Sequence, residues 1–168
     1  IQAAAERALR NGTRISDVIR KVEAIAATGA AVMVMTYWNP VLAYGVQRFA
    51  ADLSSAGGSG LITPDLIPDE ADEWLEASTQ HELERVFLVA PSSSDARIAS
   101  TTAACRGWVY AASTMGVTGA RTATSAAAPG LVERVRAATE IAVGVGLGVS
   151  TGAQAAEVAS YADGVIVG

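Results

Sequence analysis

The sequence predicts an α/β fold built on a parallel sheet, and three observations lead to that prediction. Short apolar runs alternate with amphipathic helical stretches along the 168 residues. The alternation repeats about every 25–30 residues, which is the size of one βα unit. Each apolar run leads into a loop that contains glycine or proline. Alternating units of this kind form a parallel sheet through right-handed crossovers.

The composition fits one globular domain that spans residues 1–168, with 51% hydrophobic and 17% charged residues. A net charge of −5 provides no basic surface for nucleic acid, and no apolar run approaches the roughly 20 residues that span a membrane. The single cysteine, Cys105, excludes an internal disulfide and suits a reducing compartment such as the cytoplasm. No Cys/His cluster indicates a metal site.

The first half of the chain is expected to begin with two helices, residues 1–9 and a second one capped by Ser16. The inward face of the second helix is expected to contain Val18, Ile19, Val22 and Ile25. The apolar run 30–37 then predicts a strand covered on both faces. Asn39 is the expected N-cap of a helix that reaches residue 55, with Pro40 in its first turn. Its inward face is expected to contain Leu42, Val46, Phe49, Ala50 and Leu53.

The second half continues the alternation of strand and helix. Further strands are expected at residues 60–63, 85–90, 108–112, 142–147 and 163–168, which makes six in all. The helices between them are expected to start at the acidic group 69–73 and at residues 92–95, then at 129–138 and 152–161. Gly116 and Gly119 follow the strand 108–112, and backbone amides in such a glycine loop can surround an anion.

Two sheet architectures accommodate this pattern, an open doubly wound sheet and a (β/α)8 TIM barrel. A dinucleotide-binding open sheet places Gly-x-Gly-x-x-Gly after its first strand, whereas the first strand here is followed by Tyr37-Trp38-Asn39-Pro40. Glycine loops instead follow the last three strands, as in barrels with a phosphate site. We therefore expect a partial barrel of about six βα units. The chain lacks an initiator Met and starts within a helical pattern, so two units are expected upstream of Ile1.

Six motifs, in this order and spacing, resemble the α subunit of tryptophan synthase over essentially the whole chain. They are MTYWNP at 35–40, ITPDLIP at 62–68, FLVAP at 87–91, YAASTMGVTG at 110–119, GLGVS at 146–150 and ADGVIVG at 162–168. The resemblance implies a (β/α)8 barrel that cleaves indole-3-glycerol phosphate into indole and glyceraldehyde 3-phosphate. It also implies an α2β2 heterotetramer with a β subunit that carries pyridoxal phosphate, while the α subunit itself uses no cofactor or metal.

The resemblance also assigns roles to residues of this chain. Thr118, Gly119, Gly148 and Gly168 match the phosphate-binding loops. The indole pocket is matched by Met35, Tyr37, Ile62, Leu88, Tyr110 and Leu147, with Tyr37 at its rim. Residues 113–120 match a loop that closes over the substrate, and Asn39-Pro40 with the loop around Asp65 match the face that binds the β subunit.

The chain departs from the family pattern at the reacting centre. The two catalytic carboxylates of the family are expected upstream of Ile1, and the serine that normally follows Gly168 is absent. We therefore expect the 168-residue chain alone to be inactive and, with two open sheet edges, to oligomerise or dissolve poorly. Two alternatives stay open. One is a non-catalytic domain that binds and activates a β-subunit partner. The other is a different phosphosugar barrel, such as an indole-glycerol-phosphate synthase or an isomerase.

Several residues have a structural interpretation beside a functional one. Asp65 is about as suitable for helix capping or an interface as for a site. Cys105 is expected to be a small buried apolar residue, because no base accompanies it. His81, the only histidine, is expected in a solvated position at a helix end.

Overall fold

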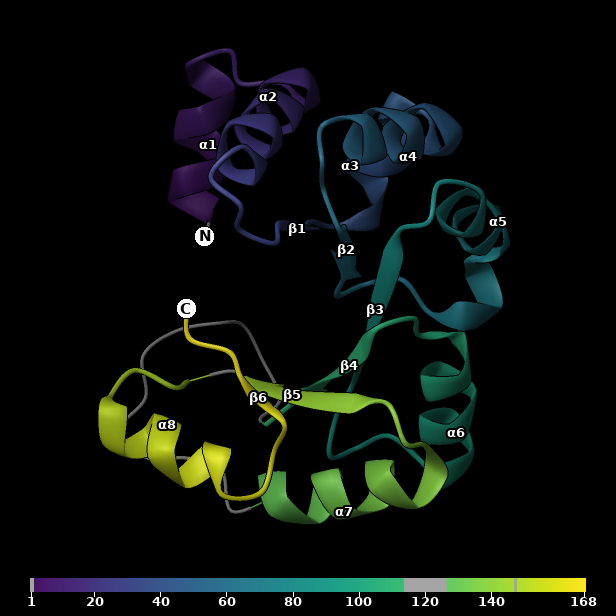
Figure 1. The fold of residues 1–168 in the computed structure, drawn as a ribbon, viewed down its shortest axis with the longest axis vertical. Coiled ribbons are helices and arrows are strands. Elements are labelled where there is room, and N and C mark those ends of the chain that lie inside the picture. Colours follow the sequence, from purple (N-terminus) through teal and green to yellow (C-terminus); the bar gives the residue numbers. More distant parts are fainter. Residues whose placement is uncertain (1, 114–126, 147) are drawn as a thin grey trace.

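The computed structural model describes residues 2–113, 127–146 and 148–168. Its six parallel strands form one sheet, and their order in the sheet follows the chain. The strands are β1 (Met33–Met35), β2 (Gly60–Thr63), β3 (Glu84–Val89), β4 (Trp108–Ala112), β5 (Ala142–Gly146) and β6 (Gly164–Val165). A doubly wound sheet would reverse its order at a switch point, and the described strands show no reversal. Figure 1 shows the sheet curving into half of a barrel, which confirms the partial (β/α)8 interpretation.

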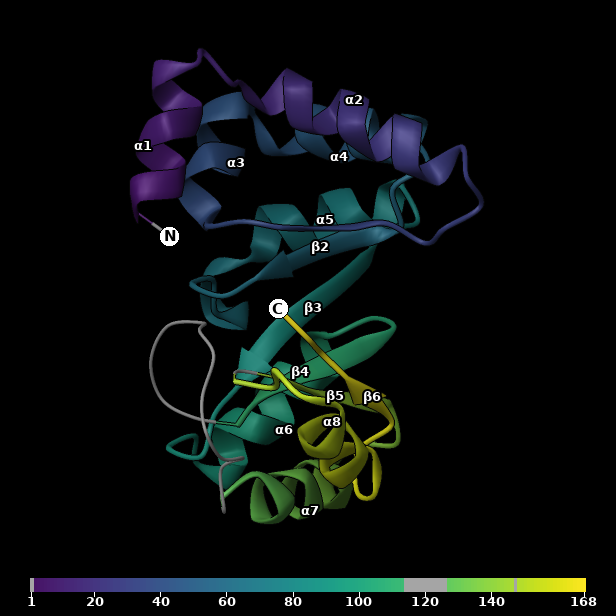
Figure 2. The same ribbon diagram turned by 90° about the vertical axis from the view of Figure 1, so that its left-hand side faces the viewer.

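The helices surround the convex side of the sheet, as Figures 1 and 2 show. In chain order they are α1 (Gln2–Arg10), α2 (Ile15–Ala26), α3 (Trp38–Tyr44), α4 (Val46–Ser55), the 3-10 turn η1 (Pro68–Glu70), α5 (Asp72–Gln80), α6 (Asp95–Ala104), α7 (Ala128–Ala138) and α8 (Gly152–Ala159). Among the described residues, no helix combines the length and the apolar character that crossing a membrane requires.

Two apolar clusters fill the space between the helices and the sheet. The first gathers α2 to α5 on β1 to β3, with Phe49, Leu61 and Trp74 fully buried. The second gathers α6 to α8 on the later strands, around Val109 and Val143. Cys105 touches both clusters, and burial raises the pKa of its thiol to about 11. A protonated thiol in an apolar setting agrees with the structural role expected for this residue.

Two predicted helix caps are wrong, because the N-cap positions are occupied by Arg14 and Tyr37, and the backbone N–H groups at these helix starts donate to the carboxylates of Asp17 and Asp65. Helix α2 begins at Ile15, and the Asp17 carboxylate accepts the Arg14 backbone N–H at 2.7 Å, so Ser16 is not the cap. Helix α3 begins at Trp38 rather than after Asn39. Its first N–H donates to both carboxylate oxygens of Asp65, at 3.0 and 3.1 Å. A side chain distant in sequence therefore satisfies a donor that local capping would otherwise serve.

The predicted helix over residues 39–55 is interrupted at Gly45, which has a φ of +96° that favours glycine. The break turns the first segment, so Val41 is buried while Leu42 is 49% exposed, contrary to the prediction. Val46, Phe49, Ala50 and Leu53 are buried as predicted. In α2 the inward position of Val22 is confirmed, but Ile25 near its end is 49% exposed.

Strand β1 is shorter than predicted, and its inner face is covered only in part. It spans Met33–Met35, not residues 30–37. Val34 is buried against the helices, whereas Met35 on the concave side is 48% exposed. The apolar run thus contains residues for two different environments, the helix layer and the inner side of the barrel. The described part of β6 is likewise short, Gly164–Val165 rather than 163–168.

Candidate functional site

The inner face of the half-barrel is defined by the alternation of side chains along the strands. Val109 and Ala111 of β4 belong to the helix-side cluster, whereas the buried Tyr110 belongs to neither apolar cluster. A Cβ at Gly146 of β5 would lie 2.5 Å from the Tyr110 hydroxyl oxygen, so this ring lies over the inner face of β5. Burial raises the pKa of Tyr110, which keeps its phenol neutral at physiological pH.

Four of the predicted indole-pocket residues come together on this inner face. Met35 pairs with Ile62 in the β1–β2 register, and Leu88 pairs with Tyr110 in the β3–β4 register. Met35, Ile62 and Leu88 lie in the second half of their strands and Tyr110 at the middle of β4. Three of the four are therefore toward the carboxyl end of the sheet, where barrels of this class place their sites. Together the four form an apolar surface with one phenol hydroxyl. Such a composition suits a flat aromatic ligand.

Tyr37 and Asp65 lie beyond the ends of their strands, at the same edge. Tyr37 follows β1 and is 53% exposed, in agreement with a position at the rim. Asp65 follows β2, and both of its carboxylate oxygens accept the Trp38 N–H. The capping interpretation of Asp65 is therefore confirmed, and its carboxylate holds the β1–α3 loop against the β2–η1 loop.

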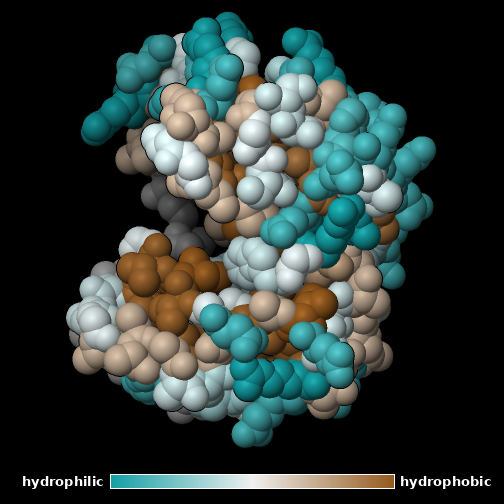
Figure 3. All heavy atoms as spheres, viewed as in Figure 1, coloured by the Kyte–Doolittle hydropathy of each residue, from teal (hydrophilic) through white to brown (hydrophobic). Residues whose placement is uncertain are grey.

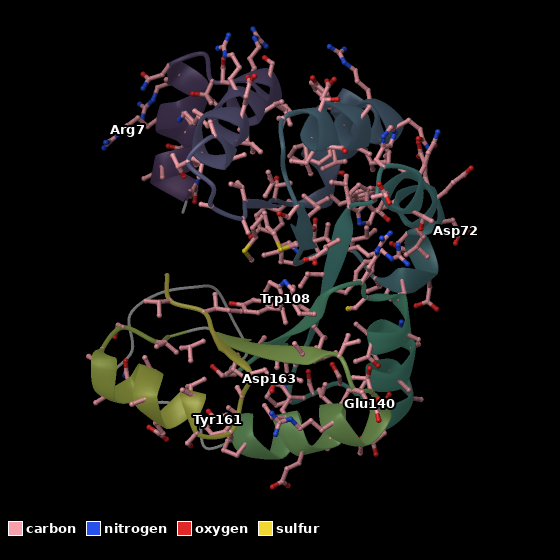
Figure 4. The ribbon with its side chains drawn as sticks, viewed as in Figure 1. Arg7, Asp72, Trp108, Glu140, Tyr161 and Asp163 are labelled. Atoms are coloured by element: carbon pink, nitrogen blue, oxygen red, sulfur yellow. The ribbon has the colours of Figure 1, made fainter. Side chains whose placement is uncertain are left out.

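A second aromatic layer lies below the predicted pocket, toward the amino ends of the strands. Trp108 packs edge-on against Tyr110, with ring centroids 6.0 Å apart at 84°. Its indole N–H donates to the sulfur of Met33 at 3.3 Å, which links β4 to β1 across the inner side. Figure 4 shows Trp108 on this concave side of the sheet. Trp108 therefore forms an aromatic floor beneath Tyr110 on the inner face.

The predicted phosphate-binding glycines that the structure describes follow neighbouring strands. Gly148 follows β5 and has a φ of +97°, and Gly168 follows β6, which pairs with β5. Thr118, Gly119 and Leu147, the other predicted contact residues, lie outside the described residues, as does most of the predicted closing loop at 113–120.

The segments on either side of Gly148 are held by hydrogen bonds. The Ser113 N–H, at the end of β4, donates to the Gly146 carbonyl at 2.9 Å. After Gly148, the Gln154 side-chain oxygen accepts the N–H groups of Ser150 and Thr151, at 2.8 and 3.1 Å. The role of Gln154 was missed in the sequence analysis. The signal is present as a capping box, Thr151-x-x-Gln154.

A hollow of about 310 Å³ lies at the opposite end of the sheet, near the amino ends of β4 to β6. Glu84, Trp108 and Asp163 are among its lining residues. The Asp163 carboxylate is already engaged, because it accepts the Val143 N–H at 2.9 Å and pairs with Arg136 at 3.0 Å. Figure 3 shows an apolar surface beside the opening of the half-barrel, near β6, where Val167 is 63% exposed. We place the candidate site at the carboxyl end, where the apolar pairs and the glycine turns converge.

Parallel strands in chain order, curved with an apolar inner face, define a chain of the (β/α)8-barrel class. The family model described as tryptophan synthase alpha chain matches residues 1–168. The chain belongs to the tryptophan synthase alpha chain family.

Curated relatives and solved structures agree with this assignment. The tryptophan synthase alpha chains of Nocardia farcinica and Mycobacterium tuberculosis (strain H37Rv) are 66% and 65% identical to this chain, covering 100% of it. The chain spans 63% and 62% of these relatives. A structure of Mycobacterium tuberculosis tryptophan synthase matches with a TM-score of 0.94 and 64% identity, over 100% of this chain and 64% of that one. The α2β2 complex from Pyrococcus furiosus matches with a TM-score of 0.89 and 31% identity. This match covers 99% of this chain and 68% of that one.

Proposed function

We propose that this chain provides the substrate-binding face of a tryptophan synthase α subunit, which cleaves indole-3-glycerol phosphate into indole and glyceraldehyde 3-phosphate. One observation carries the proposal. In a member of this family, Met35, Ile62, Leu88 and Tyr110 line the inner face of adjacent strands, the first three toward the carboxyl ends. Glycine turns follow two further strands at the same edge. The apolar face suits the indole ring and the glycine turns suit the phosphate dianion.

The residues have distinct roles in this proposal. Met35, Ile62 and Leu88 contact the ring faces and exclude water, and Tyr110 closes the pocket against the aromatic floor below it. Tyr37 lies at the mouth, and Leu147 completes the wall. The phosphate is bound by Thr118, Gly119, Gly148 and Gly168. We assign these residues to binding and orientation and not to proton transfer, because the nearby Asp65 carboxylate is engaged with the Trp38 N–H.

The test is binding of the two halves of the substrate to the 168-residue chain, measured by titration calorimetry. Glycerol 3-phosphate probes the glycine turns and indole probes the apolar face. We expect both probes to bind, and Leu88→Asp to abolish indole binding while glycerol 3-phosphate still binds. The Leu88 side chain is half-buried on the inner face, so the substitution places a charge in the pocket. The proposal is contradicted if Leu88→Asp still binds both indole and glycerol 3-phosphate. It is also contradicted if the unsubstituted chain binds neither probe.

A docking face for a β subunit is the second part of the proposal. The Asp65 carboxylate joins the loops that contain Asn39-Pro40 and Asp65 itself, and exposed apolar side chains lie on those loops or beside them. These side chains are Tyr37, Leu42 and Ile67. We propose that this face binds a β subunit carrying pyridoxal phosphate, in the cytoplasm, as part of an α2β2 assembly. The tryptophan synthase of Pyrococcus furiosus forms an α2β2 complex.

The docking proposal is tested with a β subunit and two matched variants. Asp65→Ala removes both hydrogen bonds that join the two loops, whereas Asp65→Asn retains one acceptor oxygen. We expect the alanine variant to bind the β subunit about tenfold more weakly and the asparagine variant to lie between it and the unsubstituted chain. Equal affinity of all three for the β subunit would contradict the docking face. A chain that binds the β subunit but neither substrate probe would favour the non-catalytic alternative.

We also propose that residues 1–168 form one domain. The single six-stranded sheet supports this, since it runs through both apolar clusters, and Cys105 contacts both of them.

A further inference from the structure

The turn between β5 and α8 is held by one side chain from the first turn of the helix. The side-chain oxygen of Gln154 accepts three hydrogen bonds, from the Ser150 N–H at 2.8 Å, the Ser150 hydroxyl at 3.1 Å and the Thr151 N–H at 3.1 Å. In return, the Thr151 hydroxyl accepts the Gln154 N–H at 3.2 Å. The Gln154 side chain is buried, with the residue 8% exposed. The turn is therefore fixed by a buried polar group and not by surface contacts.

These bonds determine which donors remain for a ligand. The amides of Ser150 and Thr151, at the start of α8, are directed at Gln154, so the helix caps its own N-terminus. The Ser150 and Thr151 amides are thus committed to Gln154, and the left-handed backbone of Gly148 precedes this capped segment. On the other side of Gly148, the carbonyl of Gly146 is held by the Ser113 N–H at 2.9 Å. Gly148 thus lies between two anchored points.

We propose that Gln154 is a positioning residue for phosphate binding at Gly148, an inference that rests on the proposed function. Its side-chain oxygen keeps Ser150 and Thr151 in the conformation that orients the Gly148 backbone. Without that oxygen, three donors lose their acceptor, and the turn rearranges to satisfy them elsewhere. Gln154 acts on the phosphate through the turn, and its loss affects the phosphate half of the substrate more than the indole half.

The experiment compares glycerol 3-phosphate and indole binding to the 168-residue chain and its variants by titration calorimetry. We expect Gln154→Ala to weaken glycerol 3-phosphate binding on the order of tenfold, the size seen when a group that orients a binding residue is lost. Indole affinity should change less than about twofold, because the apolar pairs lie on β1 to β4. Ser94→Ala is the matched control. It removes a comparable cap, the Ser94 hydroxyl that accepts the Arg97 N–H at 3.2 Å at the start of α6.

Gln154→Ala should lower the melting temperature at least as much as Ser94→Ala, because the Gln154 oxygen accepts three hydrogen bonds and the Ser94 hydroxyl accepts one. Only Gln154→Ala should weaken phosphate binding. Gln154→Glu provides a second arm, since a carboxylate retains the acceptor oxygens and adds a charge near the anion. In 1 M salt, where the Debye length is about 3 Å, its glycerol 3-phosphate affinity should return to within about threefold of the unsubstituted chain.

Three results would overturn the inference. The first is unchanged glycerol 3-phosphate affinity in Gln154→Ala. The second is an equal loss in Ser94→Ala, which would reflect general destabilisation. The third is a Gln154→Glu variant that, in 1 M salt, is as defective as Gln154→Ala. If the unsubstituted chain binds neither glycerol 3-phosphate nor indole, the proposed function fails as well. Binding by the unsubstituted chain with no effect of Gln154→Ala removes the inference alone.

Discussion

Gly146 makes room for the Tyr110 ring, and replacing it with alanine should disturb both stability and ring binding. A Cβ at Gly146 would lie 2.5 Å from the Tyr110 hydroxyl oxygen, 2.8 Å from its Cε2 and 2.9 Å from the Cβ of Ile166. Tyr110 is 3% exposed, so its ring has little space into which to move. Overpacking of this kind costs about 1–3 kcal/mol of unfolding free energy. The displaced ring should also weaken indole binding several-fold.

Gly144→Ala is the matched control on the same strand. Its Cβ would lie 2.8 Å from Cζ3 of Trp108, a comparable contact, but in the layer below the predicted pocket. Urea unfolding should show destabilisation of both variants, whereas calorimetry should show weakened indole binding only for Gly146→Ala. Because the shortest contact is with the hydroxyl oxygen, Tyr110→Phe in the Gly146→Ala background should recover about 1 kcal/mol, as a coupling energy between touching residues. If Gly146→Ala unfolds like the unsubstituted chain and binds indole equally well, the assignment of Tyr110 to the pocket wall is refuted.

Three further predictions concern groups away from the pocket. Arg134→Ala should lower the unfolding free energy by about 1–3 kcal/mol, because its guanidinium binds the Asp95 carboxylate at 2.8 Å and two carbonyls of the β3–α6 loop. Arg134→Lys keeps the charge but lacks the planar guanidinium, so its unfolding free energy in urea should lie between those of Arg134→Ala and the unsubstituted chain. Identical unfolding curves for all three proteins would contradict this stabilising role of Arg134. The Val143 N–H, and then Arg136, hold the pKa of Asp163 below its usual value. The resulting stability is present above the unfolded pKa of about 3.9 and is lost as the pH falls through the folded pKa. Melting temperatures of Asp163→Asn and the unsubstituted chain should therefore differ at pH 7 and converge as the pH falls through the folded pKa, and a constant difference would contradict the assignment. With a pKa of about 11, the Cys105 thiol should react with a disulfide reagent at pH 8 far more slowly in the folded chain than in urea, and equal rates would show that it is accessible.

The sequence predicted the strands well because their signals are local. Strands β2 and β4 have the predicted bounds. The choice of a barrel over a doubly wound sheet rested on the glycine loops after the last three strands and on the missing Gly-x-Gly-x-x-Gly after the first strand, and the strand order confirms it. The four apolar residues that meet on the inner face could be anticipated only through the family motifs. Periodicity alone assigns Met35 to a buried strand and does not reveal that it is 48% exposed on the inner side.

The errors arose where distant residues or competing local signals decide the structure. No local pattern shows that Asp65 caps a helix that begins at Trp38, since the two residues are separated by a whole helix–strand unit. The break at Gly45 was hidden because apolar residues continue through it at a helical spacing. The role of Gln154 could have been predicted from the capping box that it forms with Thr151. The sequence analysis interpreted the glycines before this helix as a phosphate-binding loop and made no prediction for the cap.

The chain-ordered pairing of the strands also bears on how the molecule folds. Each strand pairs with the next one along the chain, so no pairing has to wait for a distant segment to arrive. Such a topology favours growth of structure from one unit to its neighbour. The two apolar clusters meet around β3 and Cys105, so they divide the chain into two units that can open separately. Amide hydrogen exchange should therefore report two levels of protection, with Leu61 in one unit and Val143 in the other.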